Sequence, residues 1–172
     1  MPKPQSIRIL AFDTSLSSPG ACVLEITAGQ PRIIAVSHVK TDSKQPHALR
    51  AELVEAWATM FIAEHIGKGF DVIIREDFVG RTSKQSHPVH AAWSSCDRAL
   101  HKFGLNFTVP PISQSRVKSL VVGSGKAEKA DVERAVRELT GYTGEFPTDD
   151  CSDAAAVALA YALEHGLITK KR

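Results

Sequence analysis

The sequence is poor in cysteine and aromatic residues and contains no long apolar run. Its three cysteines stand far apart without a Cys-x-x-Cys spacing, which excludes a disulfide scaffold and argues against a zinc site. The longest apolar run, 154–163, is too short to cross a bilayer, so we expect no membrane partner. The first residues include two prolines and no apolar stretch, so we expect no secretory signal and a cytoplasmic location.

The length and composition are those of one globular domain. The chain has 172 residues, of which 43% are hydrophobic and 23% charged. We predict a single domain over 1–172, with a short basic tail at 167–172. The net charge of +2 hides a local imbalance, since the charged residues of 81–129 are mostly basic and those of 130–169 mostly acidic. This imbalance favours a basic strip for a polyanion beside an acidic cluster, although solvated faces of alternating sign are an alternative.

The first forty residues have the pattern of an antiparallel meander. Two turn signals, Ser-Ser-Pro-Gly and Gly-Gln-Pro, separate strands that we expect at 6–14, 21–27 and 32–40. The first strand alternates, which predicts one face with Ile7, Ile9, Ala11 and Asp13 and another with Leu10 and Phe12.

The rest of the chain alternates between strand and helix patterns. We expect helices at 46–66, 88–102, 127–139 and 151–165 and strands at 70–75 and 106–109, while 113–122 is either a short helix or irregular. This order predicts an α/β fold with a mixed sheet and helices packed on its faces.

Four acidic residues fall at the ends of predicted core elements. Asp13 closes the first strand and Glu76 follows the fourth, while Asp150 and Asp153 begin the last helix on one face. If the first and fourth strands are neighbours, the last helix can complete an acidic pocket at one sheet edge. Such carboxylates repel, so the pocket must be protonated or hold cations, and oxygen ligands suit Mg²⁺ or Mn²⁺.

Each of these signals also has a purely structural explanation. An Asp at a strand end is often a turn former, and acids at a helix start are often caps. The glycine-rich loop 121–126 departs from a Walker A motif at two positions. The motif requires Gly at position 120 and Ser or Thr at position 127, where this chain has Leu120 and Ala127. Its backbone N–H groups and Lys126 are nevertheless suited to holding a nucleic-acid phosphate.

Four segments, in this order along the chain, resemble those of a known nuclease family. The segments are Ile9-Leu10-Ala11-Phe12-Asp13-Thr14-Ser15, Ile73-Ile74-Arg75-Glu76-Asp77-Phe78, Val117-Lys118 with Val121-Val122-Gly123-Ser124-Gly125-Lys126-Ala127-Glu128-Lys129-Ala130-Asp131-Val132, and Asp150-Cys151-Ser152-Asp153-Ala154-Ala155. Together they resemble the RuvC Holliday-junction resolvases of the ribonuclease H-like superfamily.

The resemblance implies a fold and a function. The fold would be a five-stranded ribonuclease H-like sheet, with three antiparallel strands followed by parallel ones. The function would be a bacterial or phage-encoded homodimer that nicks two opposed strands of a four-way DNA junction. Two Mg²⁺ ions, for which Mn²⁺ can substitute, would be bound by Asp13, Glu76, Asp150 and Asp153. The sequence identifies no branch-migration partner, and it leaves open whether Asp149 replaces Asp150 as a ligand.

The resemblance also assigns basic and aromatic residues to the DNA. Lys129 would lie near the scissile phosphate, with Lys118 in a similar catalytic role. Backbone phosphates would be held by Arg81, Lys84, Arg116, Lys118, Lys126 and Lys129. Either Phe78 or Val79 would contact bases, and the predicted helix at 88–102, with Trp93, would carry the dimer contacts.

Departures from the family pattern leave two other functions open. The opening reads Asp13-Thr14-Ser15, whereas the family usually has Asp-Pro-Gly. This opening also resembles actin-like ATPase folds, including tRNA-modification proteins, although the chain is short for their usual two lobes. A catalytically inactive ribonuclease H-like binding module is the other alternative, which the four filled acidic positions disfavour.

Overall fold

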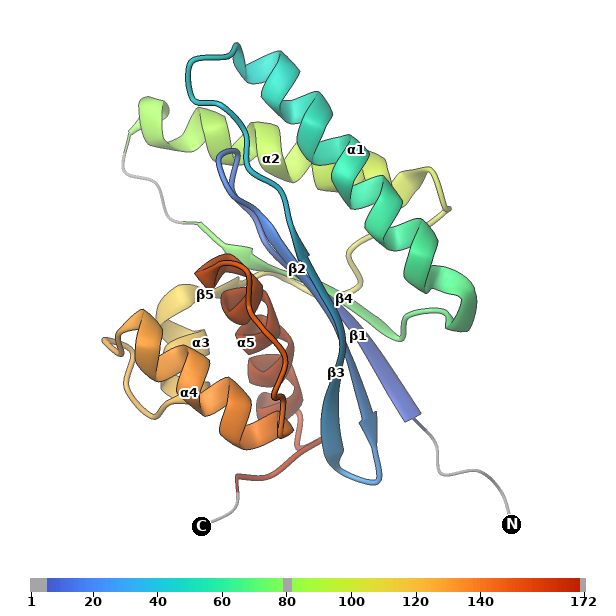
Figure 1. Cartoon of the computed structure of the whole chain (residues 1–172), viewed down its shortest axis with the longest axis vertical. Helices are drawn as coiled ribbons and strands as arrows, with labels where there is room; N and C mark the ends of the chain where they lie inside the picture. The colour runs from blue at the N-terminus through green and yellow to red at the C-terminus, as the bar shows by residue number, and fades with distance from the viewer. Residues whose placement is uncertain (1–5, 79–81, 171–172) are drawn as a thin grey trace.

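The computed structural model describes residues 6–78 and 82–170 and contains one five-stranded sheet with helices on both faces (Figure 1). The strands are β1 (Ser6–Asp13), β2 (Gly20–Thr27), β3 (Gln30–His38), β4 (Val72–Asp77) and β5 (Ile112–Ser113). The helices are α1 (His47–His65), the short η1 (Ile66–Lys68), α2 (Ser83–His101), α3 (Gln114–Val121), α4 (Lys129–Thr140) and α5 (Asp149–Glu164).

The sheet has the order β3-β2-β1-β4-β5. The first three strands pair antiparallel, whereas β4 pairs parallel to β1 and β5 pairs parallel to β4. This mixed sheet, with three antiparallel strands followed by parallel ones, confirms the predicted fold class. Both faces of the sheet are apolar, and a separate helical layer covers each of them.

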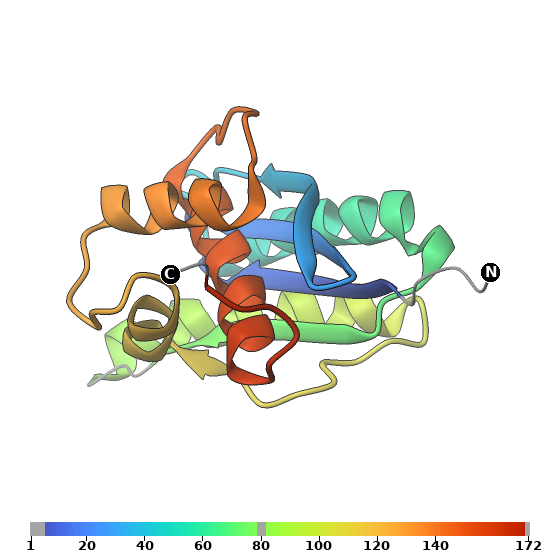
Figure 2. The same cartoon turned by 90° about the horizontal axis from the view of Figure 1, so that it is seen from below.

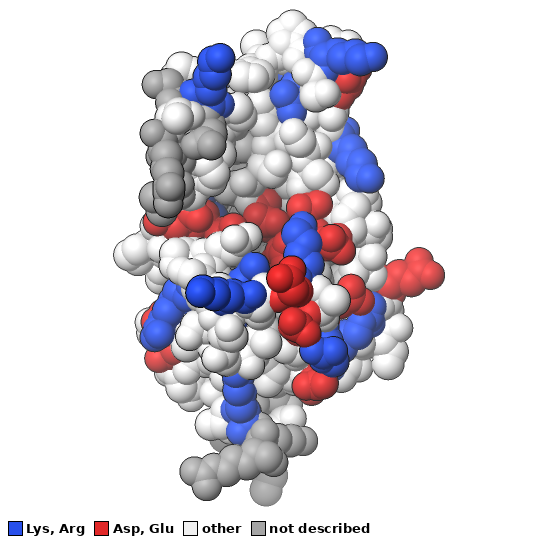
Figure 3. Space-filling view, turned by 90° about the vertical axis from the view of Figure 1, so that its left-hand side faces the viewer, with Lys and Arg blue, Asp and Glu red and all other residues white. Residues whose placement is uncertain are grey.

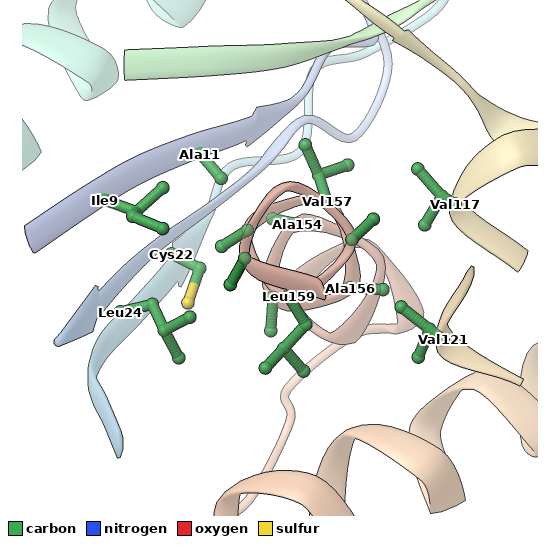
Figure 4. Close-up of a cluster of buried hydrophobic side chains, with 14 of the residues drawn as sticks. Ile9, Ala11, Cys22, Leu24, Val117, Val121, Ala154, Ala156, Val157 and Leu159 are labelled. Carbon is green, nitrogen blue, oxygen red and sulfur yellow. The ribbon is translucent and has the colours of Figure 1, made fainter. Parts of the chain in front are cut away.

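The layer formed by α3, α4 and α5 covers one face of the sheet. Its core contains Ile9 and Ala11 of β1 together with nearly the whole length of α5, from Ala154 to Ala162 (Figure 4). Small side chains on α5 let the helix lie close against β1 and β2, and α3 and α4 flank it on either side (Figure 2). Ile168 is also buried in this core and Leu167 packs against it, so the first two residues of the predicted tail are packed. The division into one domain and a tail stays a prediction.

The layer formed by α1 and α2 covers the opposite face. Leu10 and Phe12 of β1 point into it, as the alternation in the sequence predicts. The apolar stripe of α2 is used here too, since Ala92, Cys96 and Leu100 are fully buried against the sheet. That stripe therefore belongs to the core and is not a free surface for a dimer contact.

Two predicted boundaries are wrong. The segment 106–109 is not a strand, because the hydroxyl of Thr108 accepts the hydrogen bond from the Ile73 N–H (2.9 Å) where a ladder would use a carbonyl. Pro110 and Pro111 follow and have no N–H to donate. The fifth strand forms later, at 112–113, and α3 begins directly after it. Helix α2 begins at Ser83, one turn before Pro88, which lies inside the helix.

Candidate active site

The carboxyl ends of β1 and β4 place two acidic residues side by side. The parallel ladder between these strands ends with the pair Phe12↔Arg75, and Asp13 and Glu76 each follow by one residue. Both therefore have side chains on the face covered by α5, opposite to Phe12 and Arg75. This is the sheet edge at which the sequence analysis expects them.

The first turns of α5 bring two more carboxylates to the same edge. One carboxylate oxygen from each of Asp13, Asp150 and Asp153 lies within 4.8 Å of the other two. Among the described residues, these three carboxylates are the one group close enough together to share a metal ion. Glu76 stands beside the group and lines a small cavity that also contains Asp153.

Gly20 makes this approach of α5 possible. It pairs with Asp13 across β1 and β2, and a Cβ added at this position would lie 2.1 Å from the carbonyl oxygen of Asp150. Only a residue without a side chain fits there. In the sequence, Gly20 is recognisable only as part of a turn signal, because the helix that passes over it is 130 residues away in the chain.

The two aspartates at the start of α5 differ in their surroundings. Asp150 accepts a hydrogen bond of 2.7 Å from the hydroxyl of Ser18, which orients it toward Asp13. Asp149 is largely exposed and faces Lys129, with 3.7 Å between its Oδ2 and Nζ. Geometry therefore favours Asp150 over Asp149 as a ligand. Ser18 lies in the loop between β1 and β2 and has no sequence signal that marks it as functional.

The acidic cluster is electrostatically strained. Burial, followed by repulsion from Glu76, raises the pKa of Asp13 well above its ordinary value. Burial and the charge of Asp153 raise the pKa of Glu76 to about 7. Burial also raises the pKa of Asp153 to about 6, although Lys129 opposes the rise. The protein alone does not neutralise this cluster, so it favours either protons or bound cations.

Lys129 is the basic residue closest to the cluster. It occupies the first position of α4, where the hydrogen bond from the Glu128 N–H to the Asp131 carboxylate (3.3 Å) fixes the helix start. A positive charge at a helix N-terminus is unfavourable by itself, so carboxylates must compensate it. The Lys129 Nζ lies 3.8 Å from Asp153, and although partial burial alone would lower its pKa, the surrounding aspartates raise it.

Lys118 completes the basic side of the site. It projects from α3 into the same small cavity as Glu76, Lys129 and Asp153. The two lysines predicted to be catalytic therefore approach the carboxylates from α3 and α4, whereas the acids come from β1, β4 and α5. Figure 3 shows acidic side chains gathered across the middle of this side of the molecule, with basic side chains next to them.

The other predicted DNA-binding residues spread over a wider area. Lys126 is exposed in the loop before α4, Lys84 is exposed in the first turn of α2, and Phe78 is 42% exposed directly after β4. Arg116 is paired with Glu164, near the C-terminal end of α5 (2.9 Å). Fourteen residues of helix separate Glu164 from Asp150, about 20 Å, so Arg116 points away from the cluster. Arg81 and Val79 lie outside the described residues.

The donor set is suited to hard divalent cations. Every side chain that could act as a ligand offers carboxylate oxygen, and the cluster carries more negative charge than Lys129 and Lys118 balance. Mg²⁺ and Mn²⁺ prefer such oxygen donors. The residues present therefore fit a divalent metal centre beside a basic patch.

A match to a family model is consistent with this geometry. The model for "Crossover junction endodeoxyribonuclease RuvC" matches residues 9–161. The protein of that name from Neisseria meningitidis serogroup B is 30% identical over 96% of this chain and 90% of its own length. Its counterpart from Herminiimonas arsenicoxydans is 31% identical over 91% of this chain and 83% of its own length.

Solved structures show the same fold. The structure described as T. thermophilus RuvC in complex with Holliday junction substrate is similar with a TM-score of 0.78. At 22% identity, the match covers 92% of this chain and 94% of that one. The fowlpox virus resolvase bound to Holliday junction DNA is more distant, with a TM-score of 0.53 and 18% identity.

Proposed function

The chain belongs to the crossover junction endodeoxyribonuclease RuvC family, and from that premise we propose that it is a nuclease that resolves four-way (Holliday) DNA junctions. It does so by hydrolysing one phosphodiester bond in each of two opposed strands. The observation that carries this proposal is the group of Asp13, Asp150 and Asp153 with Lys129 beside it. The alternatives of an actin-like ATPase and an inactive binding module have no comparable support.

Two Mg²⁺ ions, replaceable by Mn²⁺, are the proposed cofactors. Asp13, Glu76, Asp150 and Asp153 would hold them. The raised pKa values of Asp13, Glu76 and Asp153 mean that bound cations would relieve repulsion which the fold leaves in place. When bound there, such cations would supply an activated water and would stabilise the leaving oxygen at a phosphodiester. Ser18 serves this site by holding the Asp150 carboxylate in place.

The two lysines are proposed to act on the substrate phosphate. Lys129 has its ammonium at the edge of the carboxylate group and is charged at neutral pH. There it can hold the scissile phosphate and neutralise charge that develops on its oxygens, an effect worth roughly 3 kcal/mol for one donor. Lys118, on the other side of the small cavity, contributes in the same way but less strongly.

Outside the cluster, basic residues bind the DNA backbone and one aromatic residue contacts bases. Lys84 and Lys126 are exposed and free to contact phosphates, and Phe78 lies beside Glu76 at the end of β4. Arg116 must first exchange its partner Glu164 for a phosphate. The proposed roles of Arg81 and Val79 concern residues that the structure does not describe.

A homodimer is the proposed assembly. Two symmetric nicks require two active sites related by a two-fold axis, which one chain does not provide. The buried stripe of α2 cannot form the interface, so any contact through this helix would use its exposed side, which includes Ser94, Asp97 and Arg98. A cytoplasmic location is also proposed. In the described part of the chain, no helix has the length and apolar character to span a membrane.

A cleavage assay tests the proposed function. A synthetic four-way junction and a linear duplex of the same sequence are each incubated with the protein and Mg²⁺, with a chelator as the control. We expect paired, symmetric nicks in the junction, little cleavage of the duplex, and none with the chelator. Equal cleavage of both substrates would contradict selectivity for junctions, and no cleavage of either would contradict the nuclease activity.

A further inference from the structure

Trp93 contacts the sheet directly behind the acidic cluster, on the opposite face. Its indole Nε1–H donates a hydrogen bond of 2.8 Å to the hydroxyl of Thr14. The guanidinium of Arg75 lies over its ring, 4.0 Å from the centroid. Thr14 follows Asp13 in the chain and Arg75 precedes Glu76, so one side chain of α2 contacts the neighbours of two acidic residues on two strands.

Other contacts hold the Arg75 side chain in this position. The Phe107 ring lies on the guanidinium with 4.4 Å to its centroid, and Asp97 of α2 forms an ion pair of 3.3 Å with it. The guanidinium therefore lies between two aromatic rings and is held at one end by a carboxylate. Such cation–π contacts are strongest when the cation is shielded from water, and the Arg75 side chain is only 16% exposed.

The backbone does not hold the strand ends together at this point. The ladder between β1 and β4 ends at Phe12↔Arg75, and the next two residues are Asp13 and Glu76. Their carboxylates repel one another, which tends to separate the ends of the strands. The contacts of Trp93 with Thr14 and Arg75 begin where the ladder stops, and they oppose this separation.

We propose that Trp93 is a positioning residue, which fixes the spacing of Asp13 and Glu76 through Thr14 and Arg75 and so sets the affinity of the site for divalent cations. This inference rests on the proposed metal-dependent function and deepens it. Trp93 does not contact the cations or the DNA in this role. It acts from the far side of the sheet and keeps two ligands at a separation that a cation can bridge.

The chain contains a matched control for this contact. Its other tryptophan, Trp57, lies in the same helical layer and donates a hydrogen bond of the same kind, 2.9 Å, to the hydroxyl of Ser37 on β3. The Trp57 ring touches Phe12, the residue before Asp13, and Trp57→Phe keeps an aromatic ring there; the hydrogen bond of Trp57 ends at Ser37, which adjoins no acidic residue of the cluster. Trp93→Phe and Trp57→Phe therefore remove equivalent hydrogen bonds, of which only one reaches the site.

The test measures Mn²⁺ affinity by calorimetry in the full-length protein, without DNA. We expect Trp93→Phe and Thr14→Val each to weaken Mn²⁺ binding about fivefold, the effect of one lost hydrogen bond. The double variant should be no weaker than either single one, because both remove the same bond. Trp57→Phe should bind Mn²⁺ as the wild type does. If Trp93→Phe does not fold, Thr14→Val still tests the contribution of this hydrogen bond to Mn²⁺ affinity.

A spectroscopic readout accompanies the affinities. In Trp57→Phe, Trp93 is the sole tryptophan, so its fluorescence reports on the contact with Arg75. We expect the emission to change as Mn²⁺ or Mg²⁺ fills the site, with a midpoint that matches the calorimetric one.

The outcomes separate this inference from the proposed function. Unchanged Mn²⁺ affinity in both Trp93→Phe and Thr14→Val, or an equal loss in Trp57→Phe, would overturn the role of Trp93 while metal binding and junction cleavage stand. A wild-type protein that binds no Mn²⁺ would overturn the proposed metal centre, and the role of Trp93 with it.

Discussion

Strand β1 carries an ionisable side chain near each end, the buried Arg8 and the half-buried Asp13, and the fold treats the two differently. At the start, the Arg8 guanidinium donates to Glu25 (3.2 Å) and to the carbonyl oxygens of His65 and Gly69, so each of its three nitrogens has a partner. At the other end, Asp13 faces two aspartates and Glu76, with Lys129 as the nearest counter-charge. The charge of Arg8, which stabilises the fold, therefore has its partners within the protein. Asp13 has like-charged neighbours, which fits the proposed role of this end as a cation-binding site.

The largest effect is expected from removing the like charges. Asp13→Asn, Glu76→Gln, Asp150→Asn and Asp153→Asn should each reduce cleavage by about a thousandfold or more, because each removes a proposed metal ligand. Junction affinity in gel-shift assays should survive, since the phosphate contacts remain. Glu52→Gln, an exposed acid on α1, is the control. Full activity in Asp153→Asn would remove this residue from the site and point to Asp149.

The partnered end should respond in stability, not in activity. Arg8→Met keeps the apolar stem but leaves Glu25 and two carbonyl groups without their donor. Breaking a buried, hydrogen-bonded ion pair of this kind costs about 3–5 kcal/mol in the free energy of unfolding. Urea denaturation measures the loss, and the cleavage rate of the remaining folded protein should be close to wild type. If Arg8→Met were as stable as wild type but failed to cleave, Arg8 would serve activity and not stability, which would contradict this expectation.

Lys129 should matter for the rate more than for binding. Lys129→Ala is expected to lose about a hundredfold in cleavage rate, because in the proposed mechanism the ammonium next to Asp153 neutralises charge on the phosphoryl oxygens. Lys118→Ala should lose less. Single-turnover rates at saturating enzyme separate the two roles, and recovery of the wild-type rate at saturation would make Lys129 only a phosphate anchor.

The pH dependence of stability should also differ between the two ends. The carboxylates of Glu76 and Asp153 have folded pKa values of about 7 and about 6, above their unfolded values near 4. The metal-free protein should therefore lose stability as pH rises from about 4 to about 7, because the folded state resists ionisation. We expect Asp153→Asn to reduce this loss by about 1–2 kcal/mol, and Mg²⁺ at pH 7 to offset it. Urea denaturation at several pH values measures this loss. An equal pH dependence of stability in Asp153→Asn and wild type would contradict the raised pKa of Asp153.

Much of this architecture could be predicted from short-range patterns. The alternation in β1 gives the correct face for Leu10 and Phe12, and acids at element ends mark the sheet edge where Asp13 and Glu76 meet. These predictions succeed because burial acts on residues two apart in a strand. The short strand at 112–113 could not be found in this way, since two residues carry no periodicity.

The supporting residues of the site depend on contacts that no local pattern encodes. Gly20 leaves room for the backbone of Asp150, and Ser18 donates a hydrogen bond to the Asp150 carboxylate. Trp93 donates one to the hydroxyl of Thr14. Each pair joins segments 79 or more residues apart in the chain. The resemblance to the family covers the acids and lysines but not these partners.

In the proposed metal centre, divalent cations complete the acidic end of β1. The most direct test is the number of Mn²⁺ ions bound per chain, measured by calorimetry or electron paramagnetic resonance at pH 7.5 without DNA. We predict about two ions in the wild type, the same number in Glu52→Gln, and fewer in Asp13→Asn and Asp153→Asn. The same number of bound ions in the wild type and in Asp13→Asn would contradict the account.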